Sequence, residues 1–245
     1  MKSKTLVSVI GLLSAVVCSA ANPRLIPVES RSLFAPVGFD DNDEVQIVLD
    51  GYLPDTCYRL ASPQVEVNMM ARQIVVQQMA YLFSTVCFDM TVPYTTVVSL
   101  GRIHDGEYAV VTRDGRLIRS LRVKDGGAQI GPDEFLYAPI DSARVEYRKG
   151  SSGGLTRMAV LEGRVTSSCM RLKDIKVFDH LATGTVEMLP IMAIDSLRAR
   201  EECHTAERPF KVEAPIPPIT VEGRYLLHVR SLNGASLNVV FDSRE

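Results

Sequence analysis

The chain lacks the residue groups that usually mark a metal, phosphate or nucleic-acid site. It contains no C-x₂-C pair, no closely spaced pair of histidines and no Gly-rich phosphate loop, which are common signatures of zinc and nucleotide binding. Its 27 Lys and Arg are balanced by 29 Asp and Glu, whereas a nucleic-acid-binding domain shows a basic excess. The sequence therefore predicts no metal, no cofactor and no nucleic-acid partner.

Long apolar runs are also absent, except near the N-terminus. Lys2 and Lys4 precede an apolar run over Leu6–Val17, and small residues follow it. This layout is typical of a secretory signal peptide, and the run is short for a membrane span. We interpret residues 1–20 as a signal peptide cleaved after Ala20. The remaining chain would then have no transmembrane segment and would be exported, either to the periplasm or out of the cell.

Two other interpretations of this segment stay open. A lipoprotein would carry its lipid on Cys18, although Val17 before it is bulkier than the small residue expected there. A buried N-terminal strand is the remaining alternative.

One pattern occurs twice, at an offset of 112 residues. The stretches "GYLPDTCYRL" at 51–60 and "GRVTSSCMRL" at 163–172 both read Gly, five residues, Cys, one residue, Arg-Leu. The same register aligns two shorter pairs: "PVES" at 27–30 with "PIDS" at 139–142, and "VLDG" at 48–51 with "VLEG" at 160–163. Several matches in one ungapped register indicate a duplication.

The duplication predicts two copies of one domain, each of a usual domain size. The first copy covers residues 22–123 and the second covers 139–245, and residues 124–138 form a linker that contains glycines. Short β-branched or alternating runs separated by turn residues predict an all-β chain, with an antiparallel β-sandwich in each copy.

The sequence also predicts two hairpin turns and contains three segments whose structure is less clear. Each copy ends in a hairpin signal, "RDG" at 113–115 and "LNG" at 232–234, which favours a type I′ turn. Residues 68–83 have helical spacing, but their β-branched triplet favours a strand. Residues 193–202 predict a helical turn or a short helix. The proline-rich stretch at 214–219 predicts an extended loop.

Four cysteines remain after the signal peptide, two at matching positions of each copy. In an exported chain, paired cysteines usually form disulfides. A duplicated domain is expected to close its own bridge, which selects Cys57–Cys87 and Cys169–Cys203 among the three possible connectivities. Each bridge would constrain the unfolded chain by roughly 3–4 kcal/mol. A metal site and a nucleophilic cysteine are the less favoured alternatives.

Two short motifs resemble chemical sites. The stretch "GSSGG" at 150–154 matches the nucleophile elbow with Ser152 as nucleophile, but strand-like runs flank it where the motif needs a helix after it. Asp40, Asn42 and Glu44 alternate like calcium ligands, without the glycine and the distal glutamate of an EF-hand loop. We interpret both stretches as turns and leave calcium binding open.

The remaining candidates are isolated side chains. Arg59 and Arg171 recur at the same repeat position, two residues after a cysteine, and we interpret them as structural, with a shared ligand contact as the alternative. The histidines are scattered, without the spacing of metal ligands: His104, His180, His204 and His228. The sequence therefore predicts no catalytic residue.

The Gly-x₅-Cys frame, the second cysteine and the later "GEY" motif together resemble immunoglobulin-like β-sandwich domains of exported bacterial proteins. The resemblance covers both copies, although Thr166 replaces Pro54 in the second. The chain has no tryptophan, and antibody-type domains carry one in the core, so that subtype is not expected. The resemblance implies a sandwich fold but no specific activity.

From these observations we expect a non-enzymatic exported protein with a structural role, or one that binds a protein or polymer of the envelope or the extracellular space. The rival hypothesis is a secreted hydrolase, or an inhibitor of one, whose site assembles only in three dimensions. A cavity that brings two of His104, His180, His204 and Ser152 to a carboxylate would favour the rival.

Overall fold

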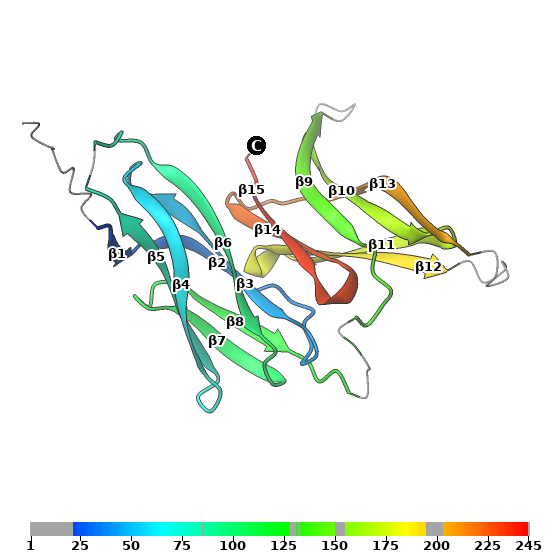
Figure 1. Ribbon diagram of the computed structural model, residues 1–245, viewed down its shortest axis with the longest axis horizontal. Coiled ribbons are helices and arrows are strands. Elements are labelled where there is room, and N and C mark those ends of the chain that lie inside the picture. The colour runs from blue at the N-terminus through cyan, green and yellow to red at the C-terminus, as the bar shows by residue number, and fades with distance from the viewer. Residues whose placement is uncertain are drawn as a thin grey trace, which may run out of the picture.

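The computed structural model describes residues 22–84, 86–127, 131, 133–149, 155–194 and 203–244. Within these ranges the chain forms β-strands and two short 3₁₀ turns, η1 (Leu181–Thr183) and η3 (Leu232–Gly234). Strands β1–β8 lie together on one side of the molecule and β9–β15 on the other (Figure 1). We refer to these two parts as the first half and the second half. The expectation of an all-β chain is confirmed.

The first half contains two sheets. One has the order β2-β3-β6, and the other has the order β1-β5-β7-β8 with β4 also paired to β5. The strands of this half are β1 (Arg24–Pro27), β2 (Ser30–Phe34), β3 (Val45–Leu53), β4 (Tyr58–Asn68), β5 (Gln73–Leu82), β6 (Val92–Gly101), β7 (Gly106–Thr112) and β8 (Ile118–Val123).

The second half also contains two sheets, with the orders β13-β10-β9 and β11-β12-β14-β15. Its strands are β9 (Ile140–Lys149), β10 (Leu155–Ser167), β11 (Met170–His180), β12 (Thr185–Ile194), β13 (Thr205–Pro215), β14 (Arg224–Arg230) and β15 (Ser236–Asp242). When β2–β8 are matched in chain order to β9–β15, the strand neighbours are the same in both halves.

The expectation of wholly antiparallel sheets is wrong at one pair in each half. Strands β5 and β7 are parallel, and so are β12 and β14. The physical reason is the path of the chain. After β5 the chain crosses to the β2-β3-β6 sheet, forms β6 there and returns as β7. Strands β5 and β7, which are neighbours in the other sheet, therefore run in the same direction. An immunoglobulin sandwich consists of two antiparallel sheets, and this pair departs from it.

The two expected hairpins form, with different turns. Asn233 and Gly234 have φ of 62° and 71°, as a type I′ turn requires. In the turn at 113–115 of the first half, Gly115 has a positive φ but Asp114 does not, so this turn is not type I′. Asp114 instead accepts a hydrogen bond from the Thr112 hydroxyl at 2.6 Å and another from the Arg116 amide, which hold the turn in another conformation.

The ambiguous segments resolve as follows. Residues 68–83 form the end of β4, a turn and β5, as the β-branched triplet indicates. The helical turn expected over 193–202 lies mostly outside the described residues, and β12 continues to Ile194. The loop expected at 214–219 begins two residues late, because Ala214 and Pro215 still belong to β13. This is an edge strand, where a missing amide donor is tolerated.

Each half buries its own apolar cluster between its two sheets. The first cluster includes Leu33, Ile47, Ile74 and Leu121, and the second is a separate set. The second set includes Ala159, Leu161, Met188 and Leu227. These residues alternate with outward-facing ones along their strands, as the pleat requires.

A third buried region joins the halves. Phe34, Val48 and Leu226 form an apolar cluster that draws on both halves. Two ion pairs cross the same junction, Asp50 with Arg224 at 2.7 Å and Asp43 with Arg230 at 2.5 Å. Strand β3 is therefore covered on both faces for most of its length, which explains its nearly continuous apolar sequence.

The stretch expected to be a linker is anchored at several points. Lys124 makes a β-bridge to Asp40, and Tyr137 makes one to Ile191. The Asp133 carboxylate accepts hydrogen bonds from the amides of the β14–β15 turn, 2.6 Å from Asn233 N. Among the described residues, no helix is long and apolar enough to cross a membrane.

Candidate functional site

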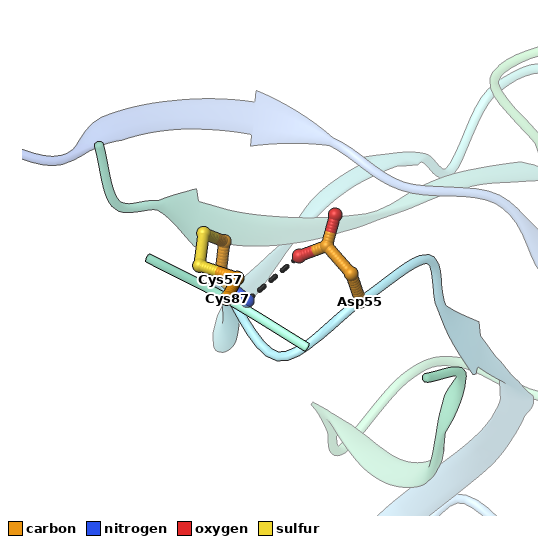
Figure 2. Close-up of side chains that lie close together, drawn as sticks. All are labelled: Asp55, Cys57 and Cys87. Carbon is orange, nitrogen blue, oxygen red and sulfur yellow. Dashed lines mark hydrogen bonds between the residues drawn. A yellow bond between two sulfur atoms is a disulfide. The ribbon is translucent and has the colours of Figure 1, made fainter. Parts of the chain in front are cut away.

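The four cysteines form two bridges, Cys57–Cys87 and Cys169–Cys203, with Cα atoms 5.4 and 5.5 Å apart. This is the pairing expected from the repeat. Figure 2 shows the Asp55 carboxylate beside the first bridge, where it accepts a hydrogen bond from the Cys57 amide at 2.7 Å. Asp55, Cys57 and Cys87 lie close enough to hold a metal. However, the sulfurs of Cys57 and Cys87 are bonded to each other, and cysteine binds a metal as the thiolate. This group is therefore structural.

The acidic loop at 39–44 is held by its own side chains. Asp40 accepts a hydrogen bond from the Asn42 amide at 2.8 Å, and Asp43 accepts one from the Asp40 amide at 2.9 Å. Asp43 also forms the buried pair with Arg230 across the junction, while Glu44 is exposed. These contacts favour the interpretation of this loop as an Asx-type turn that joins the halves.

The histidines do not converge. His104 and His204 are exposed at different places, and His204 lies 3.4 Å from the Ser168 hydroxyl. His228 is fully buried at the junction, where its Nδ1 lies 2.8 Å from Asn238 Oδ1. Burial lowers its pKa to about 4, so the ring is neutral and Nδ1 donates. Only His180 lines the cavity described below, and Ser152 lies outside the described residues.

The two repeated arginines do not share a site. The Arg59 guanidinium lies over the Phe83 ring, 5.5 Å from its centroid. Arg171 is exposed on β11, where it pairs in register with Ala193 of β12. The structural interpretation of both side chains fits these positions.

A cavity of about 480 Å³ lies between the halves. It forms where the segment after β2, the end of β8, the 133–137 stretch and the β11–β12 pair come together. Five apolar or aromatic residues make up part of its wall: Val37, Phe135, Tyr137, Phe178 and Leu189. This volume and this kind of lining are usual for a small-molecule site.

Strands β11 and β12 position the polar side of the cavity. Since side chains alternate along a strand, Lys176, Phe178 and His180 share one face of β11. Phe178 pairs in register with Glu187 of β12, which places the two side chains next to each other. Lys176 and His180 then lie on the two diagonals from Glu187.

Glu187 is the most unusual group of the cavity. Its side chain is 7% exposed, and its nearest ionisable partner is His180, whose Nε2 lies 3.8 Å from Glu187 Oε2. No hydrogen bond to this carboxylate forms within the part of the chain that the structure describes. Burial raises its pKa to about 7, and the charges of Arg230 and Lys124 oppose this shift. Glu187 therefore titrates near neutral pH, as functional carboxylates often do.

The backbone beside Glu187 leaves space for its carboxylate. Gly38 has φ of +93°, and a side chain at this position would overlap the Glu187 carboxylate. Glycine is required here for both its conformation and its small size.

Sequence reasoning missed Glu187, although a signal was present. It lies in "TVEMLPIM", which reads as a buried strand, and β12 is buried on both faces over these residues. A single carboxylate in such a run must either be paired or serve a purpose. Apart from the candidate His180, no sequence signal marked the other residues of the wall, because they come from segments far apart in the chain.

Comparison with protein families, with curated proteins and with solved structures finds no match to this chain.

Proposed function

We propose that this protein is an exported, non-enzymatic binding module built from two copies of one β-sandwich domain, and that its ligand enters the cavity between them. Duplication is supported by the identical order of strand neighbours in the two halves. Export is supported by the two disulfides, which persist in oxidising compartments. The ligand would belong to a protein, a polymer or a small molecule of the envelope or the extracellular space.

The observation that carries the binding role is the buried Glu187 carboxylate facing an aromatic-walled cavity. Burying a carboxylate without hydrogen bonds costs folding free energy. A ligand that interacts with Glu187 would recover part of that cost.

A binding experiment tests this role. The protein, with both disulfides intact, is screened against neutral aromatic fragments by ¹H–¹⁵N NMR. We expect shifts at Gly38, Phe178 and Glu187, and weaker binding in Phe178→Ala. Phe88→Ala removes an exposed ring outside the cavity wall and serves as the control. Fragment shifts that map away from the cavity would contradict the proposal.

The rival function is a hydrolase that uses Glu187 as its acid or base. The near-neutral pKa favours it. Turnover of ester, amide or glycoside reporters that disappears in Glu187→Gln and persists in Glu222→Gln, which changes an exposed glutamate outside the cavity wall, would support the rival.

A further inference from the structure

Three cations line the cavity without forming an ion pair. Arg122, Lys124 and Lys176 are exposed at its wall, and none of them lies within ion-pair distance of a carboxylate in the described chain. Elsewhere the arginines of the second half are mostly paired, as Arg144 is with Glu162 at 2.9 Å and Arg148 with Glu213 at 2.7 Å. The cavity wall therefore carries three positive charges that no ion pair among the described residues neutralises.

The aromatic wall already accommodates positive charge. Lys176 Nζ lies 4.6 Å from the centroid of the Phe135 ring, and Arg230 lies 5.5 Å from that of Tyr137. These rings are already in contact with cations of the protein itself. A cationic ligand would have to compete with Lys176 and would be repelled by its charge.

We propose that the cavity binds a small organic anion, with its acid group between Lys124 and Lys176 and its apolar part against Phe178. This inference rests on the proposed function and specifies its ligand. Lysine ammonium groups form charge-assisted hydrogen bonds with carboxylate and phosphate. Glu187, on the diagonal from Lys176, donates a hydrogen bond to the acid group when it is protonated.

Protonation of Glu187 makes the interaction depend on pH. A protonated Glu187 donates a hydrogen bond, whereas an ionised one repels the anion. The charged or titratable groups that face Glu187 come from β11, β14, the segment after β8, the 133–137 stretch and the loop before β3: His180, Lys176, Arg230, Lys124, Glu134, Tyr137 and Asp43. Of these, His180 lies 3.8 Å from the Glu187 carboxylate, measured from Nε2 to Oε2, and requires its own control.

The test uses three probes of similar size: phenylacetate, phenyl phosphate and the cation phenethylamine. Binding is measured by calorimetry and by NMR at pH 6 and pH 8. We expect one or both anions to bind and the amine not to bind. A preference between the two anions identifies the acid group as carboxylate or phosphate.

Matched variants locate the anion. The double variant Lys124→Gln/Lys176→Gln is expected to weaken anion binding at least about tenfold. Lys173→Gln, on the same strand and outside the cavity wall, is expected to leave it unchanged. Wild-type protein should bind phenylacetate about tenfold more weakly at pH 8 than at pH 6. Glu187→Gln should remove most of that difference, and His180→Gln should retain it.

Two results would overturn this inference in different ways. Binding of phenethylamine or of neutral fragments in the cavity, without binding of the anions, refutes the anionic ligand and leaves the proposed binding function intact. If probes of every charge leave the cavity signals unchanged, both proposals fail.

Discussion

Replacing Glu187 by glutamine should stabilise the protein at high pH and have little effect at low pH. In the folded protein the pKa of Glu187 is about 7, against 4.5 for an ordinary glutamate. Between these two values the folded state holds more protons at this site than the unfolded state. The contribution of Glu187 to the free energy of unfolding is therefore largest below pH 4.5 and is lost as the pH rises through 7.

The size of this effect follows from the shift. One pKa unit corresponds to about 1.4 kcal/mol, so the shift corresponds to about 3 kcal/mol. Because glutamine does not titrate, the stability advantage of Glu187→Gln should grow from about 1 kcal/mol at pH 5 to about 3 kcal/mol at pH 8.

Urea unfolding followed by circular dichroism, with the disulfides intact, measures this difference. Glu134→Gln is the control, because Glu134 lines the same cavity but is exposed, and its effect should stay within about 0.5 kcal/mol at both pH values. An equal effect of Glu187→Gln at pH 5 and pH 8 would refute the reasoning.

Three further predictions concern the junction and the disulfides. Asp43→Ala leaves the Arg230 charge buried and should lower the free energy of unfolding in urea by about 3–5 kcal/mol. The control Asp141→Ala, which breaks an exposed pair with Arg164, should lower it by about 1 kcal/mol or less, and equal losses would contradict the role of the junction. His228 has a pKa lowered to about 4 from 6.5, so its contribution to the free energy of unfolding is complete above pH 6.5 and is lost as the pH falls toward 4. The variant His228→Gln should therefore make the free energy of unfolding depend less on pH below 6.5, and an unchanged dependence would count against a buried neutral ring. Joint replacement of Cys57 and Cys87 by serine should cost roughly 3–4 kcal/mol, with the loss read from the thermal midpoint, and a midpoint unchanged from wild type would show that this bridge does not support the fold.

The sequence predicted the strands correctly where a short motif occurs in both halves. The offset of 112 residues aligns "VLDG" with "VLEG", and these segments lie at corresponding places in β3 and β10, each in the middle of a three-stranded sheet. The expectation that each copy closes its own bridge selected the disulfide pairing that the structure contains. Strand signals of this kind depend on neighbouring residues, so they can be read without the fold.

Contacts between distant segments were not predictable in this way. Nothing in "VLDG" indicates that Asp50 pairs with Arg224, 174 residues later. The parallel pairing of β5 with β7 depends on which sheet takes up β6, and strand propensity does not specify that choice. The anchored stretch at 124–138 looked like a linker because its glycines suggest flexibility, whereas Lys124, Asp133 and Tyr137 hold it in place.

The contact between the two halves raises the question of why further copies do not add to it in the same way. The face of β2 and β3 in the first half contacts the face of β14 and β15 in the second, which is a head-to-tail contact between unlike surfaces. Contacts of this type can continue from molecule to molecule and produce open filaments. At the repeat offset, Phe34 corresponds to Glu146 and Asp50 to Glu162, and both glutamates form ion pairs with Arg144 on the exposed side of β9 and β10. The second half thus presents charged side chains where the first half presents the apolar surface of the junction, and this difference disfavours the addition of a further copy at that face.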